Sequence, residues 1–187
     1  MFQPEPPDSL TLNPRKFRDS ELTADGQERA GVAFERLRTL WFNTGTLCNV
    51  TCVNCYIESS PRNDRLAYLT RADLRQFLEE LEAPAWGAEE IGFTGGEPFM
   101  NPEIMDLLRD SLARGYRVLV LTNAMRPMLQ HKEGLLALKV DYGSNLVLRL
   151  SIDHYGETLH DVERGAGSWR RMMEGFLWLS QSGFSLS

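Results

Sequence analysis

The sequence predicts an α/β fold in which parallel strands alternate with helices. Short apolar segments typical of strands recur along the chain, and segments with helical periodicity separate them. Strands joined by helical crossovers run parallel, and a sheet covered by helices has its ligand sites at the carboxyl ends of its strands. The predicted strands are residues 40–43, 90–94, 117–122 and 146–152, with a fifth that begins at Phe184.

Four helices are predicted from capping residues and apolar spacing. Thr70 and Asp73 form a capping-box pattern ahead of a stripe of leucine and phenylalanine residues. Asn101 is a suitable N-cap for the next helix, and the last helix begins at Ser168. A weaker helix, interrupted by a glycine, covers residues 128–139.

The composition is that of one globular domain. The chain has 187 residues, of which 42% are hydrophobic and 25% are charged. Residues 1–35 begin with a proline-rich stretch of little apolar periodicity, so we expect an extended or loosely ordered segment there. Residues 36–187 are then expected to form the folded core.

The charge pattern argues against nucleic acid and membrane partners. The net charge is -6, and the basic residues are scattered rather than arranged in a stripe that could follow phosphates. The N-terminal residues lack the basic and apolar stretches of a signal peptide, and no apolar run approaches membrane-spanning length. We therefore expect a soluble cytoplasmic protein.

The three cysteines of the chain are clustered. Cys48, Cys52 and Cys55 form an odd, closely spaced set, which is a poor disulfide framework but a suitable metal-binding one. They follow the first predicted strand in a stretch without helical periodicity, so a loop can wrap three thiolates around one centre. Four cysteines would saturate a four-iron cluster, whereas three leave one iron open to a small molecule.

The cysteine spacing alone also allows two different roles. One is a zinc site completed by His131, His154 or His160. The chain would then be a module that binds zinc, or an iron-sulfur cluster, without catalysis. In the second, the cysteines are unrelated buried residues. Residues elsewhere in the chain have to decide between these two roles and a reactive cluster.

Residues able to bind a ligand follow each of the next three predicted strands. The Gly95–Gly96 pair lets the backbone approach a ligand closely, and Glu97 can accept hydrogen bonds from an ammonium group. Asn123 follows the third strand. Ser151 and Asp153 have the spacing of side chains on one face of the fourth strand, where they can hold ribose hydroxyls. Together these features supply a metal anchor, an ammonium acceptor and a ribose binder on successive strand ends.

With these motifs, the sequence resembles the radical S-adenosylmethionine (radical SAM) superfamily. The resemblance rests on the Cys-x3-Cys-x2-Cys loop, on Gly95-Gly96-Glu97 and on the Ser-Ile-Asp of the fourth strand, and it covers residues 40–187. It implies a partial (β/α) barrel of parallel strands with outer helices, truncated after about four strand-helix units.

The resemblance also implies which residues bind the cofactors. Cys48, Cys52 and Cys55 would hold a 4Fe-4S cluster whose open iron binds the amino nitrogen and carboxylate of S-adenosylmethionine. The residues expected to contact S-adenosylmethionine are Tyr56 at the adenine, Gly95, Gly96 and Glu97 at the amino group, Ser151 and Asp153 at the ribose or carboxylate, Arg164 at the carboxylate, and Asn123.

The implied activity is reductive cleavage of S-adenosylmethionine to methionine and a 5'-deoxyadenosyl radical, which abstracts a hydrogen from a substrate. Such an enzyme needs a reducing electron donor, such as a flavodoxin or ferredoxin, and a small-molecule or peptide substrate. The Cys-Asn-x-x-Cys-x-x-Cys-Tyr pattern, with the later Arg-Gly and Gly-Ser-Trp, resembles branches that modify peptides or build small natural products.

Overall fold

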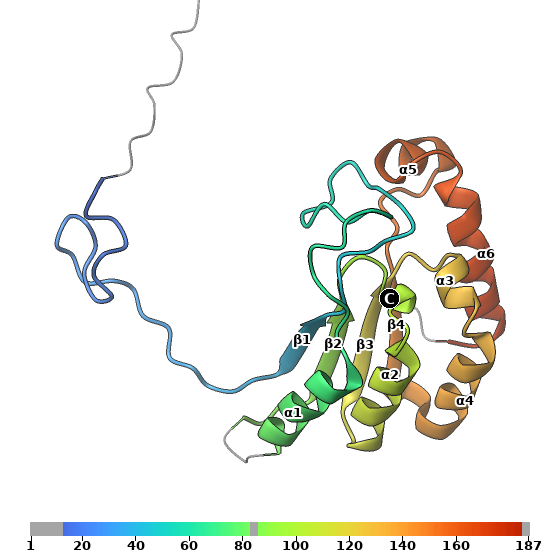
Figure 1. Cartoon of the computed structure of the whole chain (residues 1–187), viewed down its shortest axis with the longest axis horizontal. Helices are drawn as coiled ribbons and strands as arrows, with labels where there is room; N and C mark the ends of the chain where they lie inside the picture. The colour runs from blue at the N-terminus through green and yellow to red at the C-terminus, as the bar shows by residue number, and fades with distance from the viewer. Residues whose placement is uncertain (1–12, 83–85, 185–187) are drawn as a thin grey trace, which may run out of the picture. The chain divides into compact units, whose positions relative to one another are not determined.

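The computed structural model describes residues 13–82 and 86–184, and the chain divides after Glu35 into two compact units. In the first unit, residues 13–35 form turns and one isolated antiparallel bridge between Leu22 and Glu28. The named strands and helices of the described residues all lie in the second unit, where they alternate along the chain (Figure 1).

The strands form one parallel sheet whose spatial order, β1-β2-β3-β4, is also their order in the chain. Their bounds are β1 Thr39–Asn43, β2 Glu90–Thr94, β3 Arg117–Thr122 and β4 Leu146–Leu150. The predicted α/β architecture with parallel strands is confirmed. β4 ends before the predicted Ile152, and of the predicted fifth strand only Phe184 lies within the described residues, where it packs in the core.

The helices α1 to α4 form the crossovers between these strands, and α5 and α6 follow β4. Their bounds are α1 Arg71–Leu81, α2 Ile104–Ala113, α3 Arg126–Leu129, α4 Lys132–Tyr142, α5 Glu157–Arg164 and α6 Ser168–Gln181, with two 3-10 turns, η1 Pro98–Met100 and η2 Gly143–Asn145. Along the sheet, α1 packs against α2 and α2 against α4 (Figure 1). None of the helices in the described part of the chain is long and apolar enough to cross a membrane.

The main core lies between one face of the sheet and these helices. The strand register places Phe42, Phe93, Val120 and Leu148 next to one another across all four strands, and all four are buried. Each such side chain contributes about 1.5–3 kcal/mol through burial of its apolar surface. Burial of this row therefore fixes the register of the four strands, and with it the position of their carboxyl ends.

The predicted start of α1 is confirmed in detail. The Thr70 hydroxyl accepts from the Asp73 backbone N–H at 3.2 Å, and the Asp73 carboxylate accepts from the Thr70 N–H at 3.2 Å. This reciprocal pair satisfies donors that the first helical turn leaves without intrahelical partners. Leu74 and Leu78 are fully buried, as the apolar spacing predicts, whereas Phe77 remains 46% exposed.

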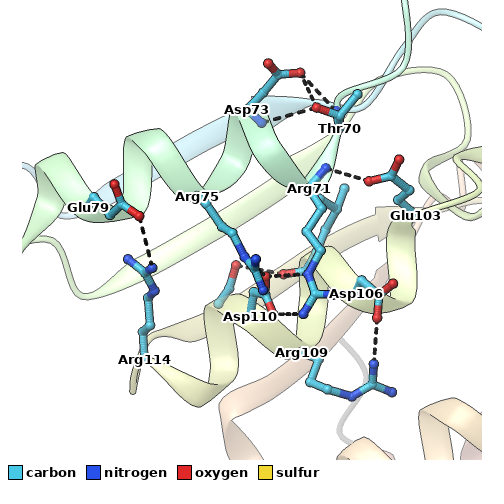
Figure 2. A network of polar contacts seen from close by, with 12 residues as sticks. Thr70, Arg71, Asp73, Arg75, Glu79, Glu103, Asp106, Arg109, Asp110 and Arg114 are labelled. Carbon is cyan, nitrogen blue, oxygen red and sulfur yellow. Dashed lines mark hydrogen bonds and ion pairs between the residues drawn. The ribbon is translucent and has the colours of Figure 1, made fainter.

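An ion-pair network joins α1 to α2 (Figure 2). Asp110 accepts from Arg71 Nε and Nη2 at 2.7 Å each and from Arg75 Nε at 2.8 Å. These contacts, chiefly the hydrogen bonds from Arg71, lower the pKa of Asp110 to about 2. The Arg71 backbone N–H also donates to Glu103 at 2.6 Å. The beginning of α1 is thereby fixed against α2.

Two predicted helix boundaries are wrong. The second helix begins at Ile104 rather than directly after Asn101, although the Asn101 side-chain oxygen caps the preceding turn by accepting from the Glu103 N–H at 2.8 Å. The Asn101 side-chain amide also donates to the carbonyls of Thr44 and Leu69 and so anchors the loop after β1. The predicted helix at 128–139 is two helices, because α3 already begins at Arg126, with Pro127 in its first turn, and ends at Leu129. In addition, α5 was not predicted.

The other face of the sheet carries Trp41, Gly92, Leu119 and Val147 in register. The Trp41 ring lies over Gly92, where an added Cβ would overlap the ring atoms. Trp41 is 44% exposed, so within the described residues this face is only partly covered. The cavity described below opens at the carboxyl end of this sheet.

Two helical glycines provide a matched test of the packing. Gly175 of α6 lies against the backbone carbonyl of Ala124, and a Cβ there would overlap it. Gly134 of α4 faces only the flexible end of Met105, 2.9 Å from an added Cβ. We expect Gly175→Ala to lower the free energy of unfolding by about 3 kcal/mol or more, and Gly134→Ala to change it by less than about 1 kcal/mol. Urea denaturation measures both, and equal effects would contradict this packing.

Candidate metal and cofactor site

The three cysteines open onto one cavity of about 230 Å³ at the strand ends. Its walls come from the loop after β1, from the turn after β2, from the ends of β3 and β4 and from the end of α5. The predicted site residues that line it are Cys48, Cys52, Cys55, Tyr56, Gly95, Gly96, Asn123, Ser151 and Arg164. Two predicted site residues, Glu97 and Asp153, are not part of the lining.

The turn after β2 holds the loop that carries the cysteines, residues 44–60, which we call the cysteine loop. The Gly96 N–H donates to the Gly45 carbonyl at 2.8 Å, and the Glu97 N–H donates to the Leu47 carbonyl at 3.1 Å. A Cβ on Gly95 would lie 2.6 Å from the Gly45 oxygen, and one on Gly96 would overlap the Leu47 carbonyl. These glycines are therefore needed for the approach of the cysteine loop itself, a reason that the sequence did not reveal.

The far part of the cysteine loop is tied back at two further points. The Cys48 N–H donates to the Ser60 carbonyl at 3.1 Å, which closes the loop on itself. The Val53 N–H donates to the Glu163 carbonyl at 2.8 Å, which attaches the loop to α5. The cysteines thus lie on a loop held by β2 on one side and by α5 on the other.

Burial favours the neutral thiol in two of the cysteines. It raises the pKa of Cys48 to about 11, and it also raises the pKa of Cys52, an effect that the nearby Arg164 opposes. Only thiolates bind metals, so a metal centre in the cavity has to displace these protons. Positively charged metal ions would stabilise the Cys48 thiolate, which its apolar surroundings do not stabilise.

The three thiols line one cavity without forming a site for a single ion among the described residues. Among the described residues, no three Cys, His, Asp or Glu side chains converge closely enough to hold one metal ion. A single zinc ion requires all of its sulfur ligands within about 2.3 Å of one point, whereas a four-iron cluster takes one thiolate at each of three separate irons. All three thiols line the same cavity.

The histidines considered for a zinc site do not line this cavity. His131 packs against Phe99, with ring centroids 5.9 Å apart. The His154 Nδ1 accepts from the Gly156 backbone N–H at 3.0 Å. His160 is buried with its ring edge toward Trp169. The residues that line the cavity with the thiols include glycine, serine and asparagine residues and one arginine, but no histidine.

Glu97 is oriented toward the protein rather than toward the cavity. Its carboxylate accepts from the Thr122 hydroxyl and the Asn123 backbone N–H at 2.8 Å each, and from the Phe99 N–H at 3.2 Å. Only 2% of the residue is exposed. Burial raises the pKa of Glu97 to about 7, although the hydrogen bonds lower it. This carboxylate joins the turn after β2 to the end of β3, and its direct contact with an ammonium group stays a prediction.

Asn123 bridges the end of β3 and the cysteine loop. Its side-chain amide donates to the Asn49 oxygen at 2.8 Å and lies 3.9 Å from the Cys48 sulfur. Its side-chain oxygen accepts from the Met125 backbone N–H at 3.1 Å. Asn49, which the sequence analysis did not single out, is therefore part of the support around Cys48.

Arg164 and Asp153 meet as an ion pair at the cavity wall. Arg164 Nε and Nη2 donate to the two carboxylate oxygens of Asp153 at 2.6 and 3.2 Å. Their side chains are 14% and 29% exposed. Asp153 thus orients the guanidinium, which lines the cavity. The prediction treated the two residues separately, because α5, which carries Arg164, was not predicted.

Ser59 is a site residue that sequence reasoning missed. Its backbone N–H donates to the Cys55 sulfur at 3.2 Å, and the residue lines the cavity. Its buried hydroxyl has no hydrogen-bond partner among the described residues. A buried polar group without a partner costs about 1–3 kcal/mol, so this hydroxyl fits a cavity that receives a ligand with acceptor atoms. Its position four residues after Cys55 was the available signal.

Comparison with known proteins identifies relatives of this site and fold. The model of the family described as the Radical SAM superfamily matches residues 42–187. The antilisterial bacteriocin subtilosin biosynthesis protein AlbA of Bacillus subtilis is 31% identical over 138 residues, which are 73% of this chain and 29% of the relative. The mycofactocin maturase MftC of Mycolicibacterium smegmatis is 27% identical and is matched over 74% of this chain and 33% of its own length. The chain spans about a third of these relatives.

Solved structures share the fold at low sequence identity. Streptococcus suis SuiB bound to S-adenosylmethionine matches 81% of this chain and 33% of its own, with a TM-score of 0.65 and 17% identity. The protein anSMEcpe with bound AdoMet matches 81% of this chain and 42% of its own, with a TM-score of 0.59 and 16% identity. These similarities confirm the predicted partial barrel of parallel strands with outer helices.

The buried Glu97 carboxylate predicts a pH-dependent stability. Its pKa of about 7 in the folded chain lies above the ordinary 4.5, so its favourable contribution is complete below pH 4.5 and is lost as the pH rises through 7. Glu97→Gln turns an amide donor toward backbone donors, which should lower the free energy of unfolding by about 1–3 kcal/mol at pH 5. The difference from the unsubstituted chain should narrow between pH 5 and pH 8.

Denaturant unfolding at several pH values measures this difference. Glu133→Gln is the control, because Glu133 is exposed and should give curves parallel to those of the unsubstituted chain. Parallel curves for Glu97→Gln as well would contradict the assignment of a buried, titrating carboxylate.

Proposed function

Because the chain belongs to the radical SAM superfamily, we propose that it forms the cofactor-binding core of an enzyme that cleaves S-adenosylmethionine reductively to begin radical chemistry. The cofactors of this family are a 4Fe-4S cluster and S-adenosylmethionine. The observation that carries the proposal is the convergence of Cys48, Cys52, Cys55 and the Gly95–Gly96 backbone on one cavity.

In this proposal, Cys48, Cys52 and Cys55 hold the cluster, and the fourth iron remains open to the amino and carboxylate groups of S-adenosylmethionine. The chemistry of the described cavity fits such a group. It offers three sulfur ligands, and the hydroxyl of Ser59 and its backbone N–H can both donate to sulfur. When bound and reduced, the cluster supplies the electron that breaks a carbon–sulfur bond of S-adenosylmethionine, which yields methionine and a 5'-deoxyadenosyl radical.

The residues of the chain position and shield the reacting groups. Cys48 is only 5% exposed, so this side of the cavity excludes water. The backbone of Gly95 and Gly96 is the proposed acceptor for the amino group. Glu97 is a positioning residue, since its carboxylate holds that turn against the Asn123 backbone at 2.8 Å.

The other wall of the cavity provides contacts for the rest of S-adenosylmethionine. Arg164, oriented by Asp153, is the proposed partner of the methionine carboxylate. Ser151 lines the same wall and is the proposed ribose contact. Tyr56 is 81% exposed at the rim, where its backbone is the proposed reader of the adenine.

The proposed substrate is a peptide. A small molecule is the alternative substrate, since the same radical could remove a hydrogen from it. This choice is supported by AlbA, whose name describes bacteriocin biosynthesis, and by a structure of SuiB bound to the precursor peptide SuiA, which has a TM-score of 0.65 to this chain. A flavodoxin or ferredoxin is the proposed source of the electron.

Product analysis tests the proposed reaction. The chain is reconstituted anaerobically with iron and sulfide, reduced with dithionite and incubated with S-adenosylmethionine. We expect 5'-deoxyadenosine and methionine in equal amounts, measured by liquid chromatography with mass spectrometry. A protein that holds one zinc ion and no iron, or an intact cluster that yields no 5'-deoxyadenosine, would contradict the proposal.

Iron content tests the structural basis of the site separately from turnover. Cys52→Ala removes one of three thiolates, so the iron per chain should fall from about four to below one. Gly96→Ala keeps all three cysteines but places a Cβ against the Leu47 carbonyl, so iron uptake should also fall. Gly134→Ala, which lies on α4, is the control and should bind iron normally. Full iron content in Gly96→Ala would show that the turn does not hold the cysteine loop.

A further inference from the structure

A second and larger cavity lies beside the cysteine loop. Its volume is about 590 Å³, and it is bordered by η1, by the start of α3, by α6 and by Asn49. Its apolar wall includes Met100, Met125 and Pro127, and its charged groups are Arg126 and Arg171. None of the functions proposed above uses this cavity.

The two arginines give the second cavity a positive character that the chain as a whole does not have. The net charge of the chain is -6, yet no Asp or Glu residue lines this cavity. Among the described residues, Arg126 and Arg171 form no ion pair, and both are exposed. Arg171 donates to the carbonyls of Gly167 and Ala166 at 3.1 and 3.2 Å, which fixes its guanidinium at the start of α6.

The second cavity borders the cysteine site through residues that contact each other. Asn49 lines the second cavity and directly follows Cys48, which lines the first. Asn49 accepts from Asn123 at 2.8 Å, and Asn123 lines the first cavity. Met125 lines the second cavity and packs in the same cluster as Cys48. The side chains of Asn49 and Met125 therefore connect the second cavity to the cysteine site.

We propose that the second cavity, through Arg126 and Arg171, is the docking site of an acidic one-electron carrier protein of the flavodoxin or ferredoxin type. The proposal rests on the proposed function, since it concerns the supply of its electron. The first cavity has to hold S-adenosylmethionine, so a protein donor needs another approach to the cluster. The second cavity borders the cysteine loop, and its two guanidiniums, which form no ion pair among the described residues, complement an acidic surface.

The electron balance of the step is simple. The anionic flavin hydroquinone of a flavodoxin gives one electron to the oxidised cluster, which becomes reduced by one electron, and the flavin becomes the neutral semiquinone. No bond is formed or broken, and no proton is transferred between the proteins. The residues of this chain contribute only the contact and the short path through Asn49 and Met125.

Charge reversal at the cavity tests the docking site. The double variant Arg126→Glu and Arg171→Glu is compared with Arg170→Glu, a neighbour on α6 whose side chain is 80% exposed and pairs with Glu157 instead. The first measurement is the Kd of a fluorescently labelled flavodoxin for the apoprotein, at low and at high salt. The second is the rate at which the reconstituted cluster bleaches when mixed with the flavodoxin hydroquinone.

We expect the double variant to weaken flavodoxin binding at least about tenfold at low salt and to slow cluster bleaching, because opposing charges across an interface control association. Arg170→Glu should behave like the unsubstituted chain. Dithionite should reduce the cluster equally in all three proteins. Flavodoxin binding and bleaching that are unchanged in the double variant would overturn the proposal, as would equal losses in Arg170→Glu. A cluster that dithionite cannot reduce would count against the proposed function instead, and the binding measurement on the apoprotein would still decide the docking site.

Discussion

The site depends on one close backbone contact, in which the turn after β2 lies directly against the cysteine loop. The Gly96 and Glu97 N–H groups donate to carbonyls of the loop at 2.8 and 3.1 Å. This contact exists only because Gly95 and Gly96 carry no side chains that would collide with the loop. The buried Glu97 carboxylate fixes the same turn to β3. The position of the thiols is therefore set by the sheet, although the thiols lie on a loop.

Two cavities that differ in chemistry lie beside this contact. One contains the thiols, the glycine turn and the Asp153–Arg164 pair, and it suits a metal cluster with a chelating ligand. The other contains apolar side chains and two arginines, and it suits a charged protein surface. Asn49 and Asn123 lie between them and bond to each other. The cysteine loop thus borders both cavities.

The sequence predicted the elements whose signals are local. The cysteine spacing, the Thr70–Asp73 capping box and the polar residues after the strands are all readable along the chain. The sequence did not predict α5, because its eight residues contain only two large apolar side chains, Leu159 and Val162, which are too few to mark an apolar stripe. Its position comes from tertiary contacts such as the Val53–Glu163 hydrogen bond. The structural role of Glu97 was hidden for the same reason, since its partners come from β3.

Three thiolates on this loop are proposed to hold a cluster with one open iron. Mössbauer spectroscopy of the chain reconstituted with iron-57, recorded with and without S-adenosylmethionine, tests this proposed arrangement. We expect one iron out of about four to change its isomer shift when S-adenosylmethionine is added. A spectrum in which no iron responds, or a chain that takes up no iron, would contradict it.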